Sequence, residues 1–176
     1  MKDLARLALD TALSRGADYA DVRLVRYRSQ NIGTEDRRVS SLSDTEDVGI
    51  GVRAIANGAW GFSGTCDLSP EGVQACAADA VAIARASAIV GQKPVSLVPE
   101  PPATRAFRTP YQIDPFAVPI EEKVGLLLEI NERLLAKRGV RKAHGFMTLR
   151  KADRMFLSSE GSDLESEVVT TNATYS

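Results

Sequence analysis

The alternation of hydrophobic and polar residues along 47–67 predicts two β-strands joined by a tight turn. Asn57-Gly58 lies between the two strands, and this dipeptide best tolerates the positive φ values of a two-residue type I′ turn. A two-residue turn also fixes the register of the hairpin. We therefore expect Arg53 to lie opposite Phe62 on the neighbouring strand.

The two faces of this predicted hairpin differ in chemistry. One face is aliphatic and suited to covering by helices, and it carries Val48, Ile50, Val52 and Ala54. The other face combines glycines with large side chains, namely Gly49, Gly51, Gly64, Arg53, Trp60 and Phe62. Glycine weakens a strand unless another backbone, a helix or a ligand must come close. The second face is therefore either a packing floor or a binding floor.

Three stretches have the apolar spacing that is typical of helices, and they cover 3–15, 69–91 and 120–139. The second stretch has a clear start, because Ser69 can cap the helix with its hydroxyl and Pro70 suits the first helical position. Its apolar stripe consists mostly of alanine, so this helix can approach a sheet closely. A sheet face that contains Gly61 and small neighbours would suit such a helix.

Four more strands are predicted outside the hairpin. They cover 21–30, 38–42, 154–157 and 165–171. The first two precede the hairpin and form with it an antiparallel meander of about four strands, because each link is too short for a parallel crossover. The last two flank a turn at 159–162. The sequence thus predicts an α+β fold, with a mainly antiparallel sheet packed by about three helices.

The amino-acid composition of the chain changes at 92–119, which holds all but one of the eight prolines. We expect this segment to be an extended connector with at most short edge strands. It separates a helix–meander–helix part at 1–91 from a helix plus strands at 120–176. The order helix, glycine, strand, turn, strand occurs in both parts, which suggests a weak internal duplication. The chain stops just after a β-rich run, so 1–176 is expected to be one domain of a longer protein.

The composition narrows the class of protein. The 176 residues carry a formal net charge of −1 and are 44% hydrophobic, which argues against a general polyanion binder. Cys66 and Cys76 do not make a disulfide framework, and they fit two thiols in a reducing compartment. No stretch is expected to reach the ~20 apolar residues of a membrane span, and the N-terminus is not a secretory signal. We expect a cytoplasmic protein.

Several motifs match the letters of catalytic or cofactor sites but lack the required context. Gly49-x-Gly51-x-x-Ala54 resembles a dinucleotide fingerprint, yet it lies inside a strand and opens no helix. The segment 61–64 resembles a nucleophile elbow but lacks the last glycine and the following helix. His144 is the only histidine, so the chain has no recognisable triad or zinc site. We expect His144 to be structural or exposed.

Arginines in the predicted meander alternate with acidic residues, which favours cross-strand pairing over nucleic-acid binding. The arginines are Arg23, Arg26, Arg28, Arg37 and Arg38, and the acids are Glu35, Asp36, Asp44, Glu46 and Asp47. Arg53 differs because it lies between Gly51 and Ile55. It could hold a peptide carbonyl or carboxylate, or it could lie over the ring of Phe62.

Several of these segments resemble a known family. They are GADYADVR at 16–23, DVGIGVR at 47–53, NGAWGF at 57–62 and DLS at 67–69, together with DPF at 114–116 and SEG at 159–161. They are similar to the N-terminal region of the TldD/PmbA proteins, which are often labelled modulators of DNA gyrase and understood as zinc-dependent peptidases. The resemblance spans the whole chain, and its glycine-rich pair of segments is closer to the TldD branch.

The resemblance implies a cytoplasmic, dimeric metallopeptidase that acts on unfolded or leader peptides, as a homodimer or with a related subunit. It implies that zinc is held by a His-Glu-x-x-x-His helix and a later cysteine in the C-terminal part, so no metal ligand carries over to these residues. This chain would then be a non-catalytic domain that is inactive alone, with Gly49, Gly51, Arg53, Trp60 and Phe62 lining the substrate channel or packing beneath it. An alternative is a stand-alone interaction module that regulates a partner such as DNA gyrase.

Overall fold

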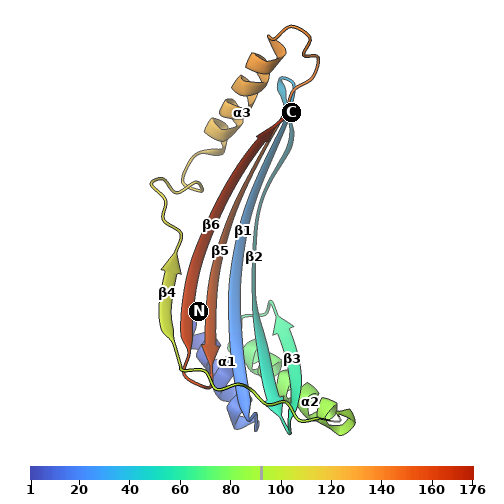
Figure 1. Ribbon diagram of the computed structural model, residues 1–176, viewed down its shortest axis with the longest axis vertical. Coiled ribbons are helices and arrows are strands. Elements are labelled where there is room, and N and C mark those ends of the chain that lie inside the picture. Colours follow the sequence, from blue (N-terminus) through green and yellow to red (C-terminus); the bar gives the residue numbers. More distant parts are fainter. Residues whose placement is uncertain (92) are drawn as a thin grey trace. The chain divides into compact units, whose positions relative to one another are not determined.

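The computed structural model describes residues 1–91 and 93–176 as three helices and six strands (Figure 1). The helices are α1 (Lys2–Ser14), α2 (Pro70–Val90) and α3 (Ile120–Leu135). The strands are β1 (Tyr19–Glu35), β2 (Arg38–Ala56), β3 (Ala59–Thr65), β4 (Thr104–Arg108), β5 (His144–Ser158) and β6 (Asp163–Tyr175).

All six strands belong to one sheet with the order β3-β2-β1-β5-β6-β4. Strands joined by tight turns are antiparallel, and β5 also runs antiparallel to β1, because Ser159 N–H donates to Ala20 C=O while Asp36 N–H donates to Ala143 C=O. The edge strand β4 is parallel to β6. The mixed, mostly antiparallel sheet with three helices confirms the predicted α+β fold, and both α–β–β parts contribute to the same sheet.

The chain forms two compact units. Unit 1 comprises 1–26, 48–107 and 153–166, and unit 2 comprises 27–47, 108–152 and 167–176. The strands β1, β2, β5 and β6 each contribute residues to both units. The division into 1–91, 92–119 and 120–176 stays a prediction about the order of the chain.

The core of unit 1 lies between the sheet and the helices α1 and α2. Alternate residues of β1 and β2 point into it, and alanine supplies most of the helical contribution. Gly61 on β3 is needed here, because a Cβ at this position would lie 2.0 Å from the carbonyl oxygen of Ala80 and 2.4 Å from the nitrogen of Ala84. This close approach confirms the predicted seat for the alanine-rich helix.

The core of unit 2 lies between α3 and its strands. Leu127 and Asn131 are fully buried on α3, and Asn131 Nδ2 donates to Thr34 Oγ1 at 3.0 Å. A Cβ at Gly145 of β5 would lie 2.7 Å from that same hydroxyl and 3.3 Å from Leu127. A glycine beneath a helix therefore recurs in unit 2, with side-chain atoms as its nearest neighbours.

The turns form as the sequence predicts. Asn57 and Gly58 have φ values of 53° and 77°, as a type I′ turn requires, and Arg53 pairs with Phe62 across the hairpin. Ser69 caps α2 by accepting a hydrogen bond from Gly72 N–H. The only strand within the described part of the connector is the short edge strand β4, as expected.

Two predictions are wrong. The strand expected at 38–42 and the first strand of the hairpin form a single strand, β2, so the meander has three strands. Finally, α2 is long and apolar enough to cross a membrane by length and composition alone. That is weak evidence, since a core helix passes the same test, and six α2 residues are buried in the core of unit 1.

Candidate functional site

The first candidate site lies in unit 1 and is built around Asp21 of β1. Period-two alternation sends Ala20, Val22 and Leu24 into the core, which places Asp21 and Arg23 on the opposite face of the strand. Asp21 is nevertheless 0% exposed. A buried carboxylate is costly unless donors surround it, so its neighbours decide whether the arrangement is stable.

Three side chains donate hydrogen bonds to the Asp21 carboxylate. Arg53 donates from Nε at 2.9 Å and from Nη2 at 2.6 Å to Oδ2, and Arg23 Nη1 donates to Oδ1 at 2.5 Å. The Tyr19 hydroxyl donates to Oδ2 at 3.2 Å. The two guanidinium groups compensate the buried charge. The hydrogen bonds that Arg53 donates to Asp21 raise the pKa of Arg53.

Aromatic rings flank these arginines. The guanidinium of Arg53 lies 4.9 Å from the ring centroid of Trp60, and that of Arg23 lies 5.0 Å from the centroid of Phe156. Tyr19 meets Trp60 edge to face at 5.9 Å. Burial, followed by the negative charge of Asp21, raises the pKa of Tyr19 to about 12. Tyr19 is therefore neutral near pH 7.

Arg53 does not lie over Phe62, which is one of the two roles foreseen from the sequence. It pairs with Phe62 in the strand register, yet its guanidinium lies over Trp60 and binds an internal carboxylate. The Arg53–Phe62 stack does not form because Asp21, on the adjacent strand β1, binds the side chain instead. The hydrogen bonds from Nε and Nη2 to Asp21 make Arg53 part of the framework of this face, and binding of a peptide group by Arg53 stays a prediction.

The glycines of the hairpin mainly make room for Phe62. A Cβ on Gly51 would lie 3.2 Å from the ring of Phe62, and one on Gly64 would lie 3.6 Å from it. Gly49 is less crowded, with Thr65 C=O at 3.4 Å from an added Cβ. The ring is still 60% exposed. These glycines thus form a floor beneath an exposed aromatic side chain.

A hollow of about 350 Å³ adjoins this face. It is lined by Arg53, Trp60, Gly61, Phe62 and Ile83. Arg53, Trp60 and Phe62 were singled out in the sequence, whereas Gly49 and Gly51 do not line the hollow. The hollow combines a cation that is already paired with two aromatic rings, which suits stacking and apolar contact better than capture of an anion.

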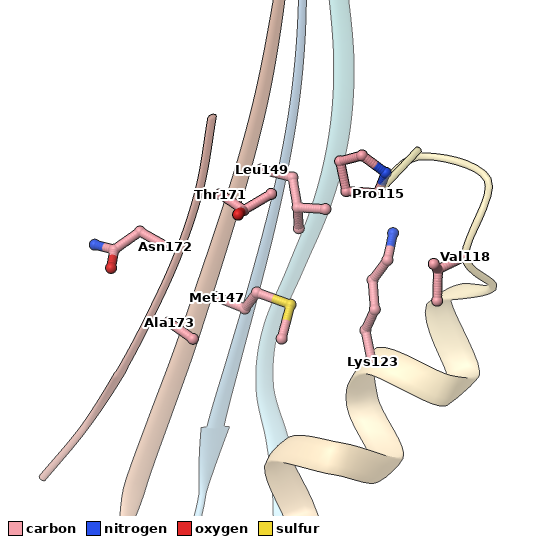
Figure 2. Close-up of a pocket in the computed structure, with 8 residues that line it drawn as sticks. All are labelled: Pro115, Val118, Lys123, Met147, Leu149, Thr171, Asn172 and Ala173. Atoms are coloured by element: carbon pink, nitrogen blue, oxygen red, sulfur yellow. The ribbon is translucent and has the colours of Figure 1, made fainter. Parts of the chain in front are cut away.

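A second candidate site lies in unit 2, where a pocket of about 260 Å³ opens beside the start of α3 (Figure 2). Its lining comes from the loop before α3, from α3 itself and from β5 and β6. The lining residues are Pro115, Val118, Lys123, Met147, Leu149, Thr171, Asn172 and Ala173. The close-up shows the Lys123 side chain between the loop residues Pro115 and Val118 and the strand residue Leu149. Lys123 is only 5% exposed.

Comparison with known proteins decides the family. Residues 20–84 match the model of PmbA/TldA metallopeptidase domain 1. A metalloprotease of Methanocaldococcus jannaschii is 24% identical over 151 residues, which are 86% of this chain and 33% of that protein. These matches confirm the predicted resemblance to the TldD/PmbA family. The assignment to the TldD branch stays a prediction.

Solved structures share the fold of this chain. A protein of Bacteroides thetaiotaomicron, described as a candidate modulator of DNA gyrase, superposes with a TM-score of 0.79 at 18% identity, over 99% of this chain and 40% of that one. A second protein so described, from Thermotoga maritima, gives 0.70 at 11% identity, and TldE from Thermococcus kodakarensis gives 0.59 at 18%; each covers 99% of this chain and 42% of the other. The chain thus spans a third to about two-fifths of these relatives.

The chain shows no grouping of His, Cys, Asp and Glu suited to a metal ion within residues 1–91 and 93–176. His144 is exposed, Cys66 is exposed and Cys76 is buried. Burial raises the pKa of the Cys76 thiol, which keeps it protonated and a poor ligand. The described residues therefore do not fit a zinc site.

Sequence reasoning missed Asp21, Tyr19 and Lys123. Asp21 and Arg23 are two residues apart in a strand and share a face, which was a usable signal for the first two. Cross-strand pairing was predicted correctly for Arg28 with Asp44. Lys123 carries no such signal, because its partner Gln30 is 93 residues away along the chain.

Proposed function

We propose that this chain is the non-catalytic, substrate-facing domain of a TldD-type zinc metallopeptidase that acts on unfolded or leader peptides. The observation that carries the proposal is the exposed aromatic face of unit 1, where Trp60 and Phe62 border a hollow beside a rigidly held arginine. Such a face can accept apolar side chains of a peptide without demanding one sequence. The metalloprotease relative supports the reaction class.

In this proposal the zinc ligands belong to the part of the family's length that this chain does not span. The domain contributes walls and anchoring, and the assembled enzyme is a cytoplasmic homodimer or a heterodimer with a related subunit. The 176-residue chain purified alone should hold no stoichiometric zinc by atomic absorption and should hydrolyse no unfolded peptide. Stoichiometric zinc or robust hydrolysis by this chain would overturn the division of labour.

The role of the aromatic face is tested in the full-length protein with Phe62→Ala. Phe62 is 60% exposed, so its removal should leave the melting temperature within a few degrees of the wild type. The KM for an unfolded peptide should rise about fivefold or more, as expected for loss of an aromatic contact. Phe107→Ala is the matched control, because Phe107 is 59% exposed on β4 and lies outside this face. Equal KM values for both variants would contradict the proposal.

A second function is favoured by the descriptions of two similar structures as candidate modulators of DNA gyrase. On this alternative the domain is an interaction module that alters the supercoiling reaction. Purified chain added to gyrase should then change the rate of supercoiling at micromolar concentration, and Phe62→Ala should weaken the effect. An unchanged rate at a large excess of the chain decides for the peptidase proposal.

A further inference from the structure

Lys123 combines deep burial with an incomplete set of partners. Its ammonium Nζ donates to Gln30 Oε1 at 2.6 Å, and this is its only hydrogen bond among the residues that the structure describes. An ammonium group has three donors, so two remain for another acceptor. At 5% exposure, bulk water has little access to satisfy them.

Within residues 1–91 and 93–176, no carboxylate forms a salt bridge or hydrogen bond with this ammonium. Gln30 Nε2 donates to Asp44 Oδ2 at 3.0 Å, and Asp44 is already held by Arg28 through Nε at 3.1 Å and Nη2 at 2.9 Å. The other nearby acid, Asp114, accepts a hydrogen bond from Phe116 N–H. Burial lowers the pKa of Lys123, as expected for a cation whose charge is not locally balanced.

A single aromatic ring serves both cations of this cluster. Arg28 lies 4.9 Å and Lys123 lies 6.0 Å from the ring centroid of Phe116. A ring face attracts a cation but does not replace a hydrogen-bonding anion. Asp44 bonds directly to Arg28, whereas the direct hydrogen-bond partner of Lys123 is the neutral amide of Gln30.

The pocket around this charge has a strand side and a helix side. Met147 and Leu149 of β5 lie on the strand side next to 171–173 of β6, and Pro115 and Val118 face them beside Lys123 (Figure 2). The strand β4 ends at Arg108, and its described bonds to β6 reach no further than Val169, so this stretch of β6 is an edge whose alternate N–H and C=O groups are free to pair.

We propose that the Lys123 pocket binds the C-terminal carboxylate of a peptide whose last residue is aliphatic. The carboxylate pairs with Lys123, the last side chain lies against Met147 and Leu149, and the preceding backbone pairs with the edge of β6. The pocket is smaller than the roughly 300–1,000 Å³ typical of sites for larger ligands, which suits one residue. The inference rests on the proposed function only in naming peptides as the source of the carboxylate.

The pocket places the carboxylate next to an apolar surface and a strand edge, and this combination distinguishes a peptide C-terminus from other carboxylic acids. An internal Asp or Glu brings a carboxylate but no further apolar group. A fatty acid brings both, but it leaves the N–H and C=O groups of the β6 edge without partners. A peptide terminus satisfies the ammonium, the apolar wall and the strand edge together.

The methionines of the chain allow a direct test, because Met147 lines the pocket while Met155 packs against the core of unit 1. With ¹³C-methyl methionine, N-acetyl-L-leucine should shift the Met147 signal saturably and leave Met155 unmoved. N-acetyl-L-leucinamide, which lacks the charge, should bind at least about tenfold more weakly. Lys123→Gln should weaken binding of the acid to a similar extent, and Lys123→Arg should restore part of it.

Lys142→Gln is the matched control, since Lys142 is an exposed lysine of unit 2 whose side chain pairs with Glu35. It should leave the affinity unchanged. An unshifted Met147 signal, equal binding of acid and amide, or tighter binding of octanoate than of N-acetyl-L-leucine would each overturn the inference. An unchanged far-ultraviolet circular dichroism spectrum, beside an unchanged Met155 signal, confirms that each variant folds. Loss of peptidase activity in the full-length protein would not alter these shifts, so the two proposals fail separately.

Discussion

In unit 1 a carboxylate is buried and three side chains donate to it, whereas in unit 2 an ammonium is buried and one amide oxygen accepts from it. Asp21 is surrounded by Arg53, Arg23 and Tyr19, and Lys123 has Gln30. Both charges lie beside aromatic rings. The contrast shows that burial alone does not distinguish a structural charge from a binding one, and that the count of local partners does.

In both units a helix packs closely over a strand glycine, but the atoms next to that glycine differ. At Gly61 the neighbours of an added Cβ are backbone atoms of α2, at 2.0 and 2.4 Å. At Gly145 the nearest neighbour is the Thr34 hydroxyl, a side-chain atom that can rotate only by giving up its hydrogen bonds with Asn131 and Gly145. An added methyl group must therefore displace helix backbone in unit 1, whereas in unit 2 it must displace a hydrogen-bonded side chain.

The largest expected effect follows from this second contrast. Gly61→Ala should reduce the free energy of unfolding by about 3 kcal/mol, because α2 must move away from β3 to accept the methyl group. Gly145→Ala should reduce it by about 1 kcal/mol, since Thr34 can change rotamer. Urea denaturation of the two variants checks the order, and a larger loss for Gly145→Ala would contradict the difference between the seats.

Removing one donor from the buried carboxylate should have the next largest effect. Arg53→Ala leaves Asp21 buried with Arg23 and Tyr19 only, and should lower the free energy of unfolding by about 2 kcal/mol. Arg108→Ala is the control, because Arg108 is exposed and pairs with Glu167 at the surface, where a salt bridge contributes less than about 1 kcal/mol. Equal losses for the two variants would show that Arg53 does not compensate Asp21.

Removing the buried ammonium should change stability less. Lys123→Met conserves volume and removes an unbalanced charge, so the free energy of unfolding should stay within about 1 kcal/mol of the wild type. The pKa of Lys123 is lowered on folding, so the unfolded chain binds more protons at alkaline pH. The wild type should therefore gain stability relative to Lys123→Met as pH rises toward 10.5. A relative loss over that range would contradict the assignment of Lys123 as an uncompensated cation.

The smallest effect concerns Tyr19. Its pKa is raised to about 12 by burial and by Asp21, so one phenol should ionise well above the ordinary value of 10.0. The stability that Tyr19 contributes is present below pH 10 and should be lost as pH rises toward 12. Ultraviolet difference titration of wild type against Tyr19→Phe measures this ionisation, and a difference spectrum centred near pH 10 would refute it.

Much of the local structure was predictable because it depends on neighbours in sequence. The turn at Asn57-Gly58 set the register of β2 with β3, and Ser69-Pro70 set the start of α2. The family could be predicted from the same short segments. The continuity of β2 was not predictable, because the exposed polar stretch at 43–47 between the two predicted strands carries no hydrophobic residue.

The sequence by itself determined where helices begin, where the chain turns and which face of the hairpin meets α2. Only the tertiary structure decided that Arg53 turns to Asp21, 32 residues away, and that Lys123 meets Gln30, 93 residues away. The physical reason is that capping, turn geometry and strand alternation depend on a few adjacent residues. The partner of a buried charge depends instead on which distant strands the sheet brings together.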